Sequence, residues 1–570
     1  MAPKALSTDI LILGSGGAGL FAALHAHKTA PDASITVAVK GLLGKCGCTR
    51  MVQGGYNVAL AREDSVERHF MDTIVGGAWL SDQELAWKLV TLAVERIREL
   101  ENELGCFFDR NADGSVHQKA FAGQTFDRTV HKGDLTGIEI INRLAEQVWA
   151  RRIGRLEEHR AVELVKSSDG AGIAGVLFVD MRTGEYVLVR AKAVLLATGG
   201  GPTMYKYHTP SGDKSCDGLA MAARAGLALR DMEMVQFHPT GLLAGTHTRM
   251  TGTVLEEGLR GSGGYLLNGA RERFMPRYDA KAERATRDLV SRAMFTEIRK
   301  GNTTPHGGLY ISMAHLGPDR VRAEFKGMVE RCADCGFDLA GGLVEVVPTA
   351  HYMMGGVEFA PDCTTSLGGL FVAGEDSGGV HGANRLGGNG VANSTVFGAV
   401  AGEAMARWAR GAVHLEPDRG SIDAAVQACE RPFGRRSNVN LESIRESLYD
   451  LMWDKVGIIR DAAGLGEAQR ELAALDAQLD SYTAPDTTRA FNLTWHDWLN
   501  LKNLVAVSRV IALAAAARKD SRGAHFRSDH PECGALERSA FTSVTHGAVS
   551  MKPVSFTRVA PGQTLLRHVA

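Results

Sequence analysis

Close to its N-terminal end the chain has an apolar strand, a glycine-rich turn, a helix and a second strand. This order constrains the fold more than any other feature of the sequence. Residues 9–13 (DILIL) are typical of a buried parallel strand, and GSGGAG follows at 14–19. An alanine-rich segment over 20–27 predicts a helix, and residues 34–39 (SITVAV) predict the second strand. A glycine pattern in this context predicts a Rossmann-like dinucleotide site.

Each glycine of that pattern has its own expected task. Gly14 permits the tight turn, Gly16 leaves room for a pyrophosphate, and Gly19 lets the helix pack against the strand. The N-terminus of the helix would face the phosphates, because its free N–H groups favour an anion. A glycine turn without a ligand is the alternative that the pattern alone leaves open.

The second strand ends at a residue that narrows the choice of dinucleotide. An acidic side chain usually stands there and binds a ribose hydroxyl, but this chain has Lys40. The lysine disfavours NAD. It is compatible with an FAD site that recognises the adenosine ribose in another way.

A second glycine-rich run, HGANRLGGN, occupies residues 381–389. Such a run favours neither helix nor strand, so it indicates close backbone approach to a ligand. Arg385 lies at its centre, and a planar guanidinium with two parallel donors suits a carboxylate. The two glycine-rich runs together indicate a flavin enzyme with an anionic substrate.

Composition excludes several other classes of protein. The chain has 570 residues, which predicts two to four domains, and its net charge of −1 argues against nucleic-acid binding. Nine cysteines are scattered, as in a reduced cytoplasmic protein, and Cys332 and Cys335 form a single CxxC without a second pair, so we expect no metal site. An iron–sulfur centre would therefore belong to a partner.

The best apolar stretch, 504–517, contains Ser508 and Arg509 and is short for a membrane span.

Motifs spread over nearly the whole chain resemble those of one flavoprotein family. The matching segments are GSGGAG at 14–19, QGG at 53–55, ATGG at 197–200, QFHPTG at 236–241, EGLRGSGGYLLN at 257–268, RDLVSRA at 287–293, HYMMGG at 351–356, HGANRLGGN at 381–389 and SRGAH at 521–525. In this order they resemble the flavoprotein subunits of fumarate reductase and succinate dehydrogenase, with L-aspartate oxidase as a relative.

The resemblance implies an α/β fold in which a Rossmann-like FAD-binding domain is interrupted by an α+β capping domain and followed by a C-terminal helical domain. The FAD-binding domain would comprise 1–234 and 346–412, the capping domain 235–345 and the helical domain 413–530. Residues 531–570 are expected to be an irregular C-terminal tail. Helical periodicity over 467–479 and 498–518 agrees with the helical domain.

The resemblance also implies which residues hold FAD. These are the glycine turn with its neighbours and a set of later positions, namely Gly14, Ser15, Gly16, Gly17, Ala18, Gly19, Lys40, Cys48, Thr49, Gln53, Gly54, Gly55, Ala197, Thr198, Gly199, Asp217, Glu375, Asn389 and Val391.

In this family FAD exchanges a hydride at N5 with one carbon of a short dicarboxylate, while a protein group handles a proton on the next carbon. The resemblance assigns Arg287 as the proton carrier, with Glu257 and Arg260 as its relay to solvent. Substrate binding would use Arg385 and His351 at one carboxylate and His238 at the other, with Phe121 and Glu256 beside the substrate. An arginine can act in this way only if a new proton arrives as the old one leaves, because arginine ordinarily keeps its proton.

Cys48 departs from the family pattern. It stands where membrane-bound members carry a histidine that is bonded to FAD. We therefore expect noncovalent FAD, with a cysteinyl link or a redox role of the Cys46–Cys48 pair as minor alternatives. In this family the absence of the histidyl link lowers the flavin potential. That favours reduction of an alkene, or oxidation of an easily oxidised substrate, over succinate oxidation.

Glu256 and Phe121 bear on which of two substrate classes the site accepts, and the sequence leaves both open. Glu256 stands where the family usually has a threonine, and a free carboxylate there would repel a substrate carboxylate unless it turns away or is protonated. Alternatively, the substrate carries a donor such as an amine or a hydroxyl at that end. Phe121 stands where aspartate oxidases carry a glutamate for the substrate amine.

The leading hypothesis is a soluble or peripheral FAD enzyme that interconverts a saturated and an unsaturated short dicarboxylate. An L-aspartate oxidase and a non-catalytic subunit that docks an electron-transfer partner are the alternatives. The sequence contains no cytochrome or cluster motif, so the electron donor or acceptor stays open.

Overall fold

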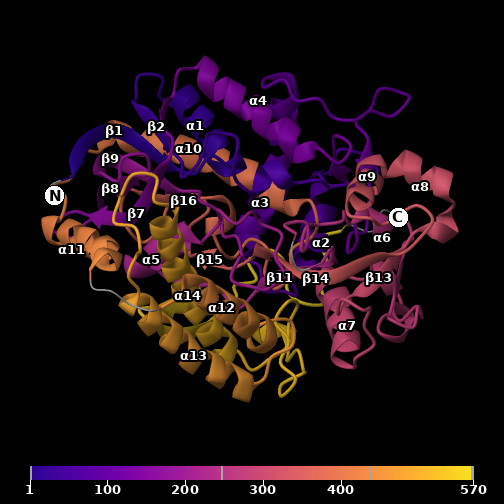
Figure 1. Ribbon diagram of the computed structural model, residues 1–570. Coiled ribbons are helices and arrows are strands. Elements are labelled where there is room, and N and C mark those ends of the chain that lie inside the picture. The colour runs from indigo at the N-terminus through magenta and orange to yellow at the C-terminus, as the bar shows by residue number, and fades with distance from the viewer. Residues whose placement is uncertain (1–2, 246–247, 435–438, 567–570) are drawn as a thin grey trace.

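The computed structural model describes residues 3–245, 248–434 and 439–566, and its elements fall into three groups. The N-terminal half and a later segment build one group around a twisted sheet. The segment near β13 and α7 lies on one side of it, and the helices α12, α13 and α14 lie beneath it (Figure 1). The site lies where the first two groups meet.

The first sheet confirms the predicted α/β class. In spatial order it contains β6 (Gly154–Leu156), β2 (Ile35–Ala38), β1 (Lys4–Leu13), β9 (Tyr186–Leu196), β8 (Ile173–Asp180) and β7 (His159–Lys166), with β16 (Leu370–Val372) also paired with β9. The strands β6, β2, β1, β9 and β16 run parallel, and β7 and β8 are antiparallel to their neighbours. Both strands predicted at the N-terminal end occur, and β1 starts earlier than expected.

Helices cover this sheet and the smaller elements beside it. They are α1 (Gly17–Thr29), α2 (Val66–Gly76), α3 (Gln83–Asn102), α4 (Thr136–Ala150), α5 (Asp217–Arg224) and α10 (Asn389–Gly411). Two glycines bring α10 against α1: a Cβ at Gly398 would lie 2.6 Å from the Ala18 carbonyl oxygen, and one at Gly402 would lie 2.3 Å from that of Ala22. The late helix α10 is thereby joined to the early nucleotide motif.

The second group has a sheet and an apolar core of its own. Its antiparallel strands lie in the order β11 (Val235–Leu242), β14 (Val344–Met353), β13 (Leu309–Ser312) and β12 (Tyr265–Leu267), accompanied by the helices α6 (Gly258–Gly261), α7 (Arg287–Arg299), α8 (Pro318–Glu324) and α9 (Lys326–Asp334). Leu266, Met294 and Ile311 belong to this core and are fully buried. The strands β11 and β14 connect this group to the first one.

The third group is helical. It comprises α11 (Arg419–Glu430), α12 (Leu441–Lys455), α13 (Ala462–Ser481) and α14 (Leu493–Ala517). Side-chain caps begin α13 and α14, where Asp461 accepts a hydrogen bond from the Gly464 amide and Asn492 accepts one from the Trp495 amide. The two periodic segments predicted from the sequence lie within these helices.

The expectation that no apolar stretch is long enough for a membrane span is wrong for α14. Within the described residues, α14 is the one helix long and apolar enough to cross a bilayer, by length and composition alone. Just over half of its most apolar stretch, 56%, is buried inside the protein. Core helices pass the same test, and the fully buried Leu501, Val505 and Ile511 pack into the apolar core.

The predicted irregular tail is also wrong in part. Residues 540–553 form a hairpin of β17 (Ala540–Thr545) and β18 (Ala548–Pro553), and β17 pairs with β10 (Leu229–Arg230), which pairs with β15 (Gly356–Val357). His546 and Gly547 make the turn with φ of 50° and 75°. A two-residue turn of this kind joins strands well, and AFTSVT before it is rich in residues that favour strands, so a signal was present. Residues 567–570 of the predicted tail lie outside the described residues.

A three-stranded sheet completes the surroundings of the site. It has the order β3 (Tyr56–Asn57), β5 (Thr129–Val130) and β4 (Gln118–Lys119), and all pairs are antiparallel. β4 ends at Lys119, two residues before Phe121.

Candidate active site

One cavity of ≈ 680 Å³ extends from the glycine turn after β1 to the arginines of the second glycine-rich run. This volume is typical of a cofactor or ligand site. Its walls include the turn at one end and Arg287, His351 and Arg385 at the other. The two glycine-rich runs, far apart in the sequence, therefore border the same space.

The glycine turn has the geometry that its sequence predicts. Gly14 has φ of +114°, and a Cβ there would lie 2.1 Å from the Ala197 carbonyl oxygen; a Cβ at Gly19 would lie 2.0 Å from the Gly14 carbonyl oxygen. Gly16 differs, because the nearest atom to its Cβ position is Thr49 Oγ1 at 3.6 Å. Gly14 and Gly19 thus pack against protein, whereas Gly16 leaves space next to the cavity, as a phosphate-binding turn requires.

Most residues predicted to bind FAD line this cavity. They are Gly14, Ser15, Gly16, Gly17, Ala18, Lys40, Cys48, Thr49, Gln53, Gly54, Gly55, Ala197, Thr198, Gly199, Asp217, Glu375 and Val391. Gly19 and Asn389 are not among the lining residues. Gly19 packs behind the turn, and Asn389 is fully buried, where its Oδ1 accepts from Asn57 and its Nδ2 donates to Thr73. Asn389 therefore supports the second glycine-rich run from behind.

Lys40 is bound to an acidic residue of the same cavity wall. Its Nζ donates to Asp217 Oδ2 at 2.8 Å and to Ser215 Oγ at 3.1 Å. Burial opposes ionisation of Asp217, but the charges of Lys40 and Arg160 hold the pKa of that carboxyl well below its usual range. Lys40 thus stands where the dinucleotide motif usually has an acid, and the carboxylate in this part of the wall comes from its partner, Asp217.

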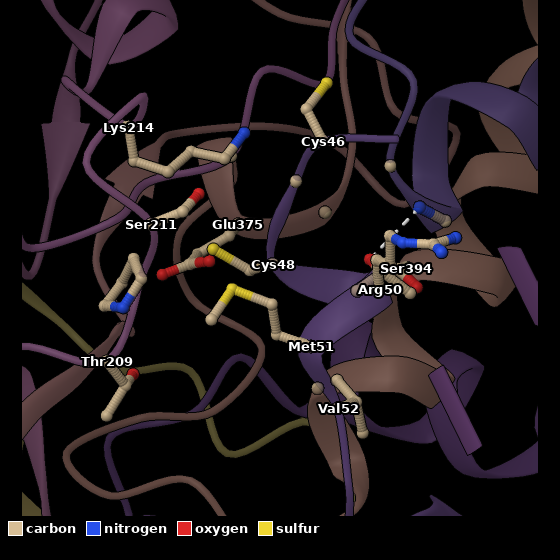
Figure 2. Close-up of a pocket in the computed structure, with 18 of the residues that line it drawn as sticks. Cys46, Cys48, Arg50, Met51, Val52, Thr209, Ser211, Lys214, Glu375 and Ser394 are labelled. Atoms are coloured by element: carbon tan, nitrogen blue, oxygen red, sulfur yellow. Dashed lines mark hydrogen bonds between the residues drawn. The ribbon is translucent and has the colours of Figure 1, made fainter. Parts of the chain in front are cut away.

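Cys48 lies in a buried polar part of the cavity. Figure 2 shows Cys48, Lys214 and Glu375 around one stretch of it, with the Cys46 thiol directed elsewhere. Burial, reinforced by the Glu375 charge, raises the pKa of the Cys48 thiol to about 12. Lys214 Nζ donates to the Thr198 carbonyl oxygen at 3.1 Å, close to the glycine turns. The wall here holds a neutral thiol and a partly exposed cation.

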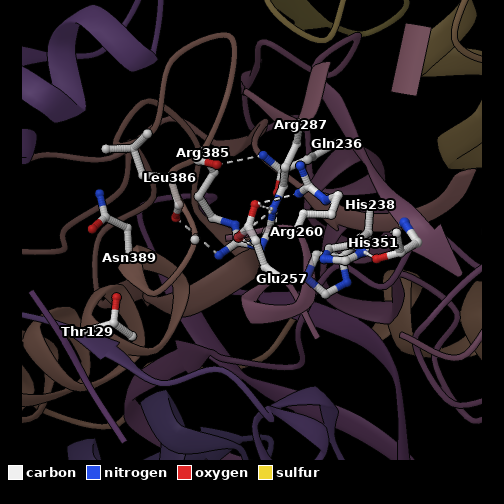
Figure 3. Close-up of polar contacts among 12 residues, drawn as sticks. Thr129, Gln236, His238, Glu257, Arg260, Arg287, His351, Arg385, Leu386 and Asn389 are labelled. Carbon is white, nitrogen blue, oxygen red and sulfur yellow. Dashed lines mark hydrogen bonds and ion pairs between the residues drawn. The ribbon is translucent and has the colours of Figure 1, made fainter. Parts of the chain in front are cut away.

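A buried ion-pair cluster forms the other end of the cavity (Figure 3). Arg287 Nη2 donates to Glu257 Oε2 at 2.7 Å, and Arg260 Nη2 donates to Glu257 Oε1 at 2.9 Å. Burial would raise the pKa of Glu257, but the charges of Arg287 and Arg260 lower it to about 2. Glu257 is therefore an anion between two cations; it and Arg287 line the cavity, whereas Arg260 lies behind them.

Gln236 joins this cluster to Arg385. Its Oε1 accepts from Arg287 Nη1 at 2.9 Å and from Arg385 Nη2 at 3.1 Å, and its Nε2 donates to the Arg385 carbonyl oxygen at 2.7 Å. A neutral acceptor between two guanidinium groups allows both to stay charged and close together. Arg385 also lies 4.3 Å from the centre of the Tyr352 ring, and burial and the charge of Arg287 lower its pKa to about 10.

Two neutral histidines complete this end. The rings of His238 and His351 are 5.5 Å apart, and burial, followed by the charge of Arg287, keeps both pKa values well below the usual range. His238 Nδ1 accepts the Thr240 amide hydrogen, so the neutral ring carries its proton on Nε2. His351 Nδ1 pairs with Thr209 Oγ1 at 2.8 Å. Each ring keeps its second nitrogen for a ligand.

Phe121 and Glu256 also line the cavity, next to the cluster. The Phe121 ring lies in a gap made by glycines, since a Cβ at Gly54 would lie 2.5 Å from it and one at Gly387 would lie 2.6 Å from it. Glu256 is paired, because its Oε2 accepts from Lys119 Nζ at 3.2 Å. From the sequence we considered that Glu256 turns away, is protonated or meets a substrate donor. None of these alternatives included Lys119 as its partner.

Three contributors were missed by sequence reasoning. Gln236 was part of a recognised motif, but only the three-dimensional arrangement gives it two arginine partners. Lys119 and Lys214 belong to no recognised motif. Glu256, an acid expected near the substrate without a partner, could have prompted a search for a cation such as Lys119, and the expected FAD phosphates could have prompted one for Lys214. Among the described residues there is no group of three or more His, Cys, Asp or Glu side chains that could hold a metal ion.

Comparison with known proteins identifies the family. Residues 9–391 match the FAD binding domain family, and residues 445–565 match the fumarate reductase flavoprotein C-terminal family. The chain is 40% identical to one subunit of the fumarate reductase (CoM/CoB) from Methanothermobacter marburgensis, over 92% of this chain and 94% of that one. It is 38% identical to an uncharacterised FAD-dependent oxidoreductase of Methanocaldococcus jannaschii, with the same coverage.

Solved structures agree with these sequence relatives. A point variant of FrdA from the quinol fumarate reductase of E. coli superimposes with a TM-score of 0.92 at 32% identity, covering 98% of this chain and 99% of that one. Sdh1 of Mycobacterium smegmatis gives a TM-score of 0.86 at 34% identity, covering 97% and 95%. The chain therefore belongs to the fumarate reductase and succinate dehydrogenase flavoprotein family and is an FAD-dependent oxidoreductase.

Proposed function

We propose that this protein reduces the double bond of a short unsaturated dicarboxylate of the fumarate type, using electrons that reach FAD from a separate donor. The observation that carries the proposal is the meeting of Arg287, Arg385, His238 and His351 at one end of the FAD cavity. A cavity end with cations and imidazole donors suits a ligand with two carboxylates.

FAD, when bound, supplies the exchange of two electrons with the substrate. The residues that would hold it are the glycine turn at 14–19, Lys40 with Asp217, and the polar part of the wall at Cys48, Lys214 and Glu375. The Cys48 thiol, with its raised pKa, is a poor nucleophile, which supports noncovalent FAD.

The clamp for the substrate uses donors with fixed directions. Arg385 Nε has no hydrogen-bond partner among the residues that the structure describes, and its Nη2 is held by Gln236, so the guanidinium is oriented before a ligand arrives. His351 would share one carboxylate with it, and the Nε2–H of His238 would donate to the other. Prior orientation of this kind lowers the entropic cost of placing a substrate for reaction.

Proton delivery would use Arg287. Its pairing with Glu257 fixes the guanidinium in the cavity, and Arg260 behind Glu257 continues the charged chain to the Glu283 carbonyl oxygen. Glu257 is an anion, so the replacement proton would come from Arg260: as Arg287 gives a proton to the substrate carbon, Glu257 would take one from Arg260 and pass it to Arg287, and solvent would then reprotonate Arg260. The chain Arg287–Glu257–Arg260 supports this role because each member is hydrogen-bonded to the next.

The alternative of an L-aspartate oxidase has less support. It would need a free carboxylate for the substrate ammonium, and the carboxylate at hand, Glu256, is bound to Lys119. Phe121, an apolar ring, occupies the other expected position.

We further propose that the donor is an electron-transfer partner protein. The M. marburgensis relative is named as one subunit of a fumarate reductase, which implies further subunits in that enzyme. The absence of cluster-binding cysteine runs in the sequence agrees with a separate donor.

Stopped-flow absorbance of the purified holoenzyme tests the function. The bound flavin is reduced without oxygen and mixed with fumarate, with related unsaturated dicarboxylates, or with buffer. We expect rapid return of the oxidised flavin spectrum with at least one dicarboxylate and none with buffer. A flavin that no dicarboxylate reoxidises would contradict the proposal, and bleaching of the oxidised enzyme by L-aspartate would favour the alternative.

A further inference from the structure

Glu256 raises an electrostatic problem for any dianionic substrate. It is 5% exposed, it lines the cavity, and it is the chain neighbour of the anion Glu257. A second carboxylate beside a substrate carboxylate weakens binding, because like charges at short range repel strongly where water is excluded.

Lys119 is positioned to solve this problem. Its Nζ lies 3.2 Å from Glu256 Oε2, and the two side chains are 19% and 6% exposed. The lysine ends β4 and also lies 5.9 Å from the centre of the Phe121 ring, while the glutamate lies just before α6. The pair therefore joins two separate parts of the chain at the wall of the substrate end.

A count of the charges at the substrate end shows what the Lys119–Glu256 pair would change there. Within the buried cluster, Glu257 offsets one of the three arginines Arg260, Arg287 and Arg385, which leaves two positive charges for a substrate with two negative ones. Arg331 and Asp134 also line the cavity, and as one cation and one anion they leave this balance unchanged. An unpaired Glu256 would remove half of that excess. With Lys119 bound to it, Glu256 contributes no net charge.

We propose that Lys119 is a specificity-determining residue that neutralises Glu256 and so keeps the cavity selective for dianions. The inference rests on the proposed function, since it concerns the same substrate. One titratable side chain just after the neighbouring strand β5, His131, interacts with Lys119. Burial and the charge of Lys119 lower the pKa of His131 to about 4, so the histidine is neutral and Lys119 has Glu256 as its charged partner there.

A double-mutant cycle tests this proposal. The variants are Lys119→Gln, Glu256→Gln and the double variant, with Lys119→Arg as the matched control, all as holoenzyme at about pH 8, where an unpaired carboxylate stays ionised. Two readouts are used: KM and kcat for fumarate with a reduced viologen dye as donor, and the dissociation constant of malonate, an unreactive dianion, from its effect on the flavin spectrum.

The expected pattern has opposite signs for the two single variants. Lys119→Gln raises KM and the malonate dissociation constant roughly ten- to a hundredfold, the size of repulsion between unit charges at about 7 Å and an effective dielectric constant of about 20. It changes kcat by less than about threefold. Glu256→Gln tightens malonate binding, the double variant returns both constants to near wild type, and Lys119→Arg stays near wild type.

Two results would overturn the proposal: unchanged constants in Lys119→Gln, or a double variant as weak as that single one. A merely structural role predicts the second result, because removal of Glu256 does not repair a lost packing contact. If wild-type enzyme neither turns over a dicarboxylate nor binds malonate, the proposed function itself fails, and the two failures are thus distinguishable.

Discussion

The two ends of the cavity are built by different means. At the nucleotide end the walls are largely backbone: Gly14 and Gly19 pack against carbonyl oxygens, and Gly16 leaves space for a ligand. At the substrate end the walls are side chains held by one another, through Arg287, Glu257, Gln236 and Arg385. The first end depends on local conformation, whereas the second depends on contacts between distant segments. Substitutions at the nucleotide end should therefore affect stability and FAD binding, whereas those at the substrate end should affect activity.

The largest effect is expected at the substrate end. Arg287→Ala should lower kcat roughly a thousandfold or more while the enzyme keeps its FAD, because the proton carrier is lost and the cofactor cradle is untouched. Steady-state reduction of fumarate and the ratio of flavin to protein measure both. Arg299→Ala, an exposed position on the same helix, serves as control. Full activity of the Arg287 variant would eliminate the proposed proton route.

At the glycine turn we expect substitutions to affect stability and FAD binding and not the chemical step. Gly14→Ala should destabilise the protein by about 3 kcal/mol or more, because the new Cβ collides with the Ala197 carbonyl and φ is +114°. Gly16→Ala should leave the stability of the apoprotein nearly unchanged and weaken FAD binding. Urea unfolding of apoprotein and fluorescence titration with FAD separate the two effects. If the two variants lost the same stability and the same FAD affinity, Gly14 would not differ from Gly16 in the way proposed, with one packing against protein and the other leaving space for the ligand.

A smaller loss is expected at the junction of the two arginines. Gln236→Leu should lower kcat/KM roughly ten- to a hundredfold, about 1.4–2.7 kcal/mol, because Arg287 and Arg385 lose their shared acceptor and move apart. The flavin content should stay constant. An unchanged kcat/KM for fumarate would mean that the arginines hold their positions without the amide.

The last prediction concerns a pH-dependent contribution from the support beneath the second glycine-rich run. His69 donates from Nε2 to Asn389 Oδ1 at 2.9 Å, and burial, with the charge of Arg128, lowers its pKa to about 3. Below pH 6.5 the unfolded chain binds a proton that the folded protein refuses, so stability falls as pH falls. The contribution is about 1.4 kcal/mol per pH unit between pH 6.5 and the folded pKa.

Urea unfolding between about pH 5 and 7, which covers the upper part of this titration, measures the change of stability with pH. His69→Gln keeps a donor for Asn389 and has no titratable ring, so its stability should vary less with pH than that of the wild type. Identical slopes would exclude His69 as a source of the acid sensitivity.

The same contrast explains what the sequence could predict. The strand, turn and helix of the nucleotide end follow from a contiguous segment, and the early strands, α1 and the long helices were found at nearly their observed positions. The carriers of charge at the substrate end were found through motifs. Lys119, Lys214 and the bridging role of Gln236 were not, because their partners come from segments far away in the sequence and only the fold brings them together.

Two further misses have local causes. The hairpin over 540–553 has a normal turn signal, but the polar, proline-bearing composition around it favoured an irregular tail. The apolar stretch considered for a membrane span, 504–517, is short and interrupted by Ser508 and Arg509, whereas α14 begins earlier, at Leu493, and continues through both residues. The boundaries predicted for the FAD-binding, capping and helical domains stay predictions, as does the cytoplasmic location.

The pairing of β17 with β10 has a consequence for biosynthesis. Thr542 donates its amide hydrogen to Asp231, a residue 311 positions earlier in the chain. While the ribosome is still translating the intervening codons, β10 has its β15 neighbour at most and one open edge. This sheet can therefore be completed only after residues 540–545 have been translated, and until then the edge of β10 that β17 covers is unpaired.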